Sequence, residues 1–176
     1  MHWIAFSILL YVVTVLQTTV TPFFAVHGIR PDLLVIVAAH YALTARPQDA
    51  LLACWFIGLA ADLTGLGFAK HASVGAHALA LGLMGLLVVN VRELTFRDSV
   101  VTQLFFTLVV GAGQFLLVGL YFWYAVANRP ALSAVVLSGL YSAIYTALVA
   151  PYGHWLLRRI RGQLGLGAVG RVRAGR

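Results

Sequence analysis

Apolar residues dominate six long runs of this chain, and short polar breaks separate the runs. Clear breaks fall at residues 46–49, 92–98 and 128–130, each of which contains charged residues. Backbone groups in lipid must hydrogen-bond within their own segment, so apolar runs of this kind predict helices. A membrane β-barrel needs strict alternation of apolar and polar residues, which residues 33–39 lack. The six helices are predicted at residues 3–26, 31–45, 49–69, 73–91, 99–126 and 132–157.

The composition agrees with a membrane protein. Hydrophobic residues make up 61% of the chain and charged residues only 10%, whereas about a quarter of the residues are charged in a typical soluble domain. We therefore expect an all-α membrane protein with a six-transmembrane-helix bundle over residues 1–157. A basic, flexible cytoplasmic tail is expected over residues 158–176.

The positive charges set the expected orientation. With six crossings, most lysines and arginines fall on the same side of the membrane as both termini, which are therefore predicted to be cytoplasmic. The second run, residues 31–45, measures about 22 Å as a helix and is short for a full crossing. If it only dips into the bilayer, five crossings remain, and the charges do not exclude that arrangement.

Four ionisable residues are expected to gather in the outer third of the bundle. Asp62 and His77 lie at similar depth on neighbouring helices, and Arg30 and Asp32 open the second helix at the same level. An unpaired carboxylate costs several kcal/mol there, so Asp62 requires a partner such as His77. Three interpretations remain open: the cluster ties helices together, docks another membrane protein, or belongs to a ligand or ion pathway.

No catalytic residue, cofactor or metal site is predicted. Ser73, His77 and Asp62 have the composition of a triad, but triads are defined by geometry and no Gly-x-Ser-x-Gly elbow occurs. His71 and His77 are six residues apart, which does not place two ligands on one helical face. Cys54 is the only cysteine and lies in an apolar run, so it is interpreted as a small hydrophobic residue.

Small residues predict close helix contacts, above all between the third and fourth helices, because association in lipid depends on close backbone approach. The residues expected to pack helices or to form a groove for a partner are Gly58, Ala61, Gly65, Gly75, Ala78 and Gly82.

The tail explains most of the net charge of +7, so that charge does not indicate nucleic-acid binding. Its first arginines, Arg158, Arg159 and Arg161, are expected to contact anionic membrane lipid.

Residues 29–90 resemble the MreD family of rod shape-determining proteins. The resemblance rests on Arg30-Pro31-Asp32 before a short apolar helix with Tyr41. It continues through residues 58–63, Gly-Leu-Ala-Ala-Asp-Leu, to Gly75 and the helix that follows.

The resemblance implies a non-enzymatic scaffold of the cell-elongation machinery in the bacterial inner membrane. Proteins of this family are understood to bind the single-span protein MreC. With it they support RodA and a class B penicillin-binding protein in lateral peptidoglycan synthesis, coordinated with MreB. Their bundle is also similar to the substrate-binding subunits of energy-coupling-factor transporters. The alternative is therefore a vitamin-binding membrane subunit of such a transporter.

Overall fold

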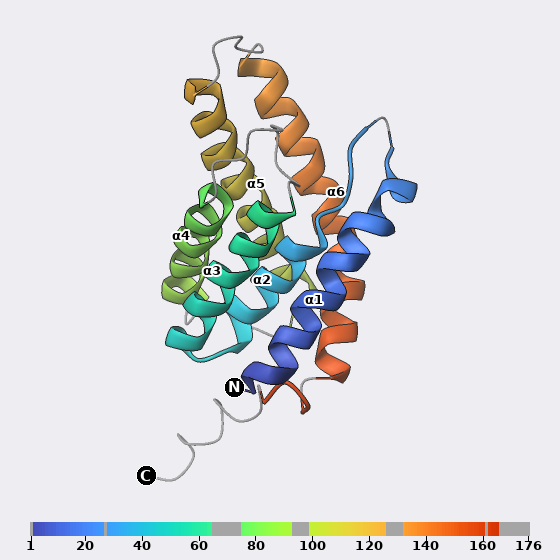
Figure 1. The fold of residues 1–176 in the computed structure, drawn as a ribbon, viewed down its shortest axis with the longest axis vertical. Coiled ribbons are helices and arrows are strands. Elements are labelled where there is room, and N and C mark those ends of the chain that lie inside the picture. The colour runs from blue at the N-terminus through green and yellow to red at the C-terminus, as the bar shows by residue number, and fades with distance from the viewer. Residues whose placement is uncertain are drawn as a thin grey trace.

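The computed structural model describes residues 2–26, 28–64, 75–92, 99–125, 132–160 and 162–165. Within these ranges the chain is all-α, as the sequence predicts, and one α-helix corresponds to each of the six apolar runs (Figure 1). The α-helices are α1 (Trp3–Thr19), α2 (Leu33–Thr44), α3 (Pro47–Leu63), α4 (Ala76–Val91), α5 (Val100–Ala125) and α6 (Leu132–Arg159), and a 3-10 turn, η1 (Thr21–Phe24), follows α1.

The first helix is shorter than the sequence predicts. The apolar run continues to residue 26, but α1 ends at Thr19 and the chain turns through η1. Pro22 explains the difference, because proline has no N–H to donate to the preceding turn and its ring clashes with the carbonyl four residues earlier. Hydropathy alone does not predict that α1 ends at Thr19.

α2 is the central element of the bundle. It contacts each of the other five α-helices, and residues 34–43 are all buried. Its 12 residues measure about 18 Å at 1.5 Å per residue, well under the hydrocarbon thickness of a bilayer. Because α2 is buried on every side, its length is not set by the need to reach both membrane surfaces through lipid.

Two helices of the described residues, α5 and α6, are long and apolar enough to cross a membrane on their own. α1, α2 and α4 are shorter apolar helices. Figure 1 shows α5 and α6 extending beyond the other helices at the end of the bundle away from the N-terminus, which we call the distal end. At the opposite end His2 donates a backbone hydrogen bond to Leu164 at 3.2 Å, so these two residues, one from each end of the chain, lie together.

Candidate functional site

The carboxylate of Asp62 makes four hydrogen-bond contacts at the start of α4. It lies in the last turn of α3 and reaches the first turn of α4. Its Oδ2 accepts from the N–H groups of Gly75 at 2.9 Å and Ala78 at 3.1 Å. Its Oδ1 accepts from the N–H of His77 at 3.0 Å and lies 2.9 Å from His77 Nδ1. Asp62 therefore caps α4 from outside that helix.

Gly75 explains why the cap comes from another helix. The first N–H groups of any helix lack partners within it, and a polar side chain at the preceding position usually satisfies them. Gly75 holds that position in α4 with φ +116°, a left-handed conformation that favours glycine, and it has no side chain to offer. The Asp62 side chain, only 1% exposed, supplies the missing acceptor.

The position of the Asp62 carboxylate matches the electrostatics of a helix N-terminus. The N-terminus of a helix carries partial positive charge, and convergent N–H groups stabilise an anion. Both carboxylate oxygens of Asp62 already accept two bonds each. Chemically, the site is a helix cap in which both carboxylate oxygens are hydrogen-bonded.

Close packing of α3 on α4 positions this helix cap. A Cβ atom placed on Gly58, one turn before Asp62, would lie 2.5 Å from Ala78 Cα, so only glycine fits there. A Cβ on Gly85 would meet Cys54 Sγ at 2.8 Å. The two helices therefore approach along most of their length, as the small residues of the sequence predict.

The start of α2 is a second polar junction. The Asp32 carboxylate accepts from the N–H groups of Leu34 and Val35 and so caps its own helix. Gln17 of α1 accepts from the N–H of Leu33 at 2.8 Å through Oε1. Its Nε2 donates to the carbonyl of Pro31 at 3.3 Å.

Two hydroxyls of α6 hold the same segment from the other side. Thr146 accepts from the N–H of Asp32 at 2.9 Å, and Ser142 donates to the carbonyl of Arg30 at 2.9 Å. These hydroxyls are four residues apart and so face the same way on α6. The entry to α2 is therefore fixed by α1 and α6 together.

Two of the four ionisable residues of the predicted cluster are in direct contact, since His77 bonds Asp62. Asp32 instead bonds the first turn of its own helix. Arg30 differs, since it is an exposed residue and takes part through its backbone carbonyl.

A buried polar contact links α2, α5 and α6 in the interior. The Nδ1 atoms of His40 and His154 lie 3.0 Å apart, so one ring donates to the other, and His154 Nε2 lies 3.2 Å from Thr107 Oγ1. The sequence offers His40 and His154 only as isolated histidines in apolar runs, and nothing in their spacing predicts that they pair.

Arg92 is a structural residue that the sequence does not reveal. Hydropathy places Arg92 in the polar break at residues 92–98 and so predicts a charged residue in a loop. It is in fact 3% exposed, and its Nη1 donates to the carbonyls of Ala42 and Ala45 at 2.7 Å each. Arg92 therefore caps the C-terminal end of α2, where a cation also complements the helix dipole.

The remaining predicted residues have separate positions. Ala61 and Ala78 are buried with Gly58 at the contact of α3 and α4. Gly82 is half-buried, and a Cβ there would have its nearest contact at 3.9 Å, with Trp55. Arg158 and Arg159 end α6. Gly65 and Arg161 lie outside the described residues.

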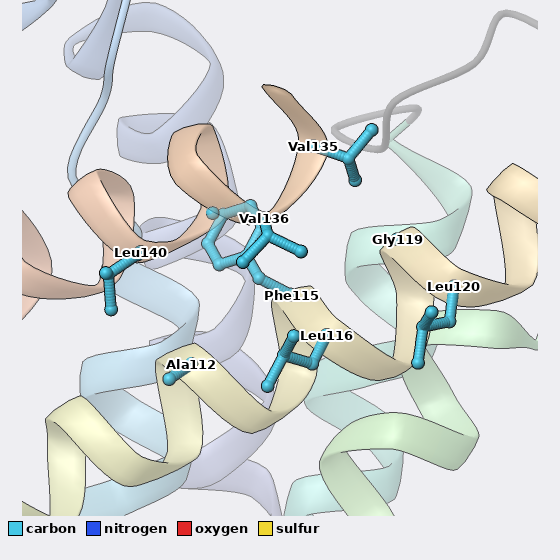
Figure 2. A pocket seen from close by; sticks show the side chains of 9 residues that line it. Ala112, Phe115, Leu116, Gly119, Leu120, Val135, Val136 and Leu140 are labelled. Carbon is cyan, nitrogen blue, oxygen red and sulfur yellow. The ribbon is translucent and has the colours of Figure 1, made fainter. Parts of the chain in front are cut away.

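In the part of the chain that the structure describes, three open grooves lie between helices on the surface. One lies between α5 and α6 and is lined by apolar side chains including Phe115, Leu120, Val136 and Leu140 (Figure 2). A second, of about 400 Å³, lies between α1 and α3 and includes Tyr11. A third lies between α4 and the distal part of α5. None of the three is lined by Asp62 or His77.

The fold and the site together define a class of protein: an apolar helical bundle in which acidic side chains cap the helix ends. Within the described residues, no group of three or more His, Cys, Asp or Glu could hold a metal ion. A sequence model of the rod shape-determining protein MreD matches residues 1–159, so the chain belongs to the MreD family. Comparison with curated proteins finds no match, and neither does comparison with solved structures.

Proposed function

We propose that this MreD-family protein is a non-enzymatic scaffold of the bacterial inner membrane that binds MreC. Membership of the family supports a role in rod shape determination. In this proposal the chain holds MreC within the membrane and so supports lateral peptidoglycan synthesis by RodA and a class B penicillin-binding protein alongside MreB. The family match does not support the vitamin-binding alternative.

One observation carries the scaffold proposal. The Asp62 carboxylate, for which the sequence leaves a ligand or ion pathway open, is occupied by four contacts to α4 and to Gly75 just before it. A group used in this way stabilises the bundle. The contacts of Asp62 with Gly75, His77 and Ala78 are therefore best explained as the support for a rigid frame on which a partner docks.

A membrane frame of six crossings with both termini in the cytoplasm is part of this proposal. The contact between His2 and Leu164 supports termini on one side. The short α2 is compatible with a crossing segment because other helices surround it and satisfy polar groups at its two ends.

The partner is expected in one of the open grooves. Gly58, Ala61 and Ala78 are already used between α3 and α4, so they do not offer a free surface. The three grooves instead present exposed side chains to lipid: Tyr11 at 71%, Leu79 at 72% and Leu140 at 46%. A single apolar helix packs into such a groove by van der Waals contact.

Site-specific crosslinking tests the proposal. A photoreactive amino acid is placed at Tyr11, Leu79 or Leu140, one for each groove, in a tagged chain co-expressed with MreC. The matched control is Leu148, which is 63% exposed on α6 and lines none of the three grooves. We expect MreC to co-purify and to crosslink strongly from one groove and not from Leu148. Absence of MreC from the purified, folded chain, or equal crosslinking from Leu148, contradicts the proposal.

A further inference from the structure

Along one face of α6, the chemical type of the exposed side chains changes in a regular order toward the C-terminal end of the helix. Leu148, Tyr152, Trp155 and Arg159 are all exposed, and their spacing places them along one side of the helix. The order is aliphatic, aromatic, aromatic and cationic. Aromatic rings with a polar atom prefer the headgroup level of a membrane, and arginine extends its charge beyond that level into water. This face therefore marks where α6 leaves the hydrocarbon.

Trp155 and Arg159 form a defined pair on this face. The guanidinium carbon of Arg159 lies 5.7 Å from the centre of the Trp155 ring, within the range of a cation–π contact. Within the described residues, Arg159 forms no salt bridge with a carboxylate. The stacked guanidinium is thus held beside an exposed indole and remains available to an external anion.

We propose that Trp155 and Arg159 form a binding site for the phosphodiester of an anionic phospholipid. A planar guanidinium can donate two parallel hydrogen bonds to phosphate oxygens, which an ammonium group cannot do. The indole contacts the glycerol and upper acyl region and offers its own N–H at headgroup level. The site rests on the membrane placement in the proposed function, and it adds a ligand that the scaffold role does not require.

Arg158 differs from Arg159 in its exposure and is not part of the proposed site. It is half-buried, whereas Arg159 is exposed. It therefore faces the bundle more than Arg159 does. Together the two arginines offset the negative end of the α6 dipole, which would otherwise repel a phosphate.

Thermal unfolding of the purified full-length chain in a neutral detergent tests the site. Dioctanoyl phosphatidylglycerol is titrated against dioctanoyl phosphatidylcholine, which has the same chains and no net charge. We expect the anionic lipid to raise Tm in a saturable way and the neutral lipid to leave it unchanged. Loss of one arginine contact, at about 1 kcal/mol, corresponds to about a fivefold weaker apparent affinity. Arg159→Gln and Trp155→Leu should each show this loss, and Arg159→Lys should recover part of it.

Arg46→Gln is the matched control. Arg46 is an exposed arginine at the start of α3, and its substitution removes the same charge. This variant should bind phosphatidylglycerol like the unmodified chain. Equal responses to the two lipids, or a loss in Arg46→Gln as large as in Arg159→Gln, would overturn the site and leave only general charge attraction. Co-purification of MreC is read out separately, so failure of the lipid site is distinguishable from failure of the scaffold proposal.

Discussion

Gly58 and Gly82 look equivalent in the sequence, since both are glycines within apolar helices that pack together. The structure separates them. Gly58 faces the backbone of α4 with no room for a Cβ, whereas Gly82 has only an ordinary contact with Trp55. A small residue in a membrane helix therefore marks a close approach only when the neighbouring backbone lies directly opposite.

Substitution of these two glycines by alanine gives a matched test. Gly58→Ala forces α4 away from α3 and is expected to destabilise the chain by about 1–3 kcal/mol. Gly82→Ala needs no displacement and removes the entropic cost of a helical glycine. Its effect should therefore lie between zero and a gain of about 1 kcal/mol. Thermal unfolding of both purified variants measures the difference, and equal stabilities would contradict the packing described for Gly58.

At the scale of elements, the sequence predicts the positions of the helices but not how their ends are satisfied. Among the described residues, one α-helix corresponds to each apolar run because lipid-like environments require internally bonded backbone. Asp62 and His77 could be placed at one level because helix rise fixes depth. The sequence also predicts that α2 is short, but it does not predict the central position of α2 in the bundle.

The missed features depend on contacts between distant parts of the chain. Arg92 reaches Ala42 and Ala45 about fifty residues earlier, and His40 meets His154 across 114 positions. Periodicity and spacing describe local structure, so they carry no signal for such pairs. The bonds of Gln17 to Pro31 and Leu33 likewise join two helices and carry no local signal.

The α2 cap can be tested through Arg92. Arg92→Met keeps a long apolar stem and removes the donors to Ala42 and Ala45, leaving those carbonyls unpaired. We expect a loss of about 1.5–3 kcal/mol in stability, as for a hydrogen bond to a charged group. Backbone amide exchange should also accelerate at Ala45, whose N–H bonds the carbonyl of Tyr41.

Arg46→Met serves as the control for this change, because Arg46 is an exposed arginine between α2 and α3. Its effect on stability should stay within about 0.5 kcal/mol. If Arg92→Met were no less stable than this control, and exchange at Ala45 were unchanged, the cap would have no energetic role.

At the scale of the whole molecule, the bundle is asymmetric along its axis. One end holds His2 and Leu164, while α5 and α6 project at the other (Figure 1). With six crossings, these two ends face opposite sides of the membrane.

Cysteine labelling tests that orientation. Cys54 is 1% exposed and is first replaced by alanine, which leaves a cysteine-free background. Single cysteines are then introduced at Ser133, near the distal end of α6, and at Gln163, next to Leu164. A membrane-impermeant maleimide added to spheroplasts should label Ser133→Cys and should label Gln163→Cys only after permeabilisation. Labelling of Gln163→Cys in intact spheroplasts would refute cytoplasmic termini.

The burial of α2 has a consequence for biogenesis. The ribosome makes α2 early, but Thr146 and His154, which meet Asp32 and His40, emerge more than a hundred residues later. Until α6 arrives, the newly inserted α2 has polar groups without their final partners. The second helix to be synthesised therefore reaches its finished surroundings only when the last one has been delivered.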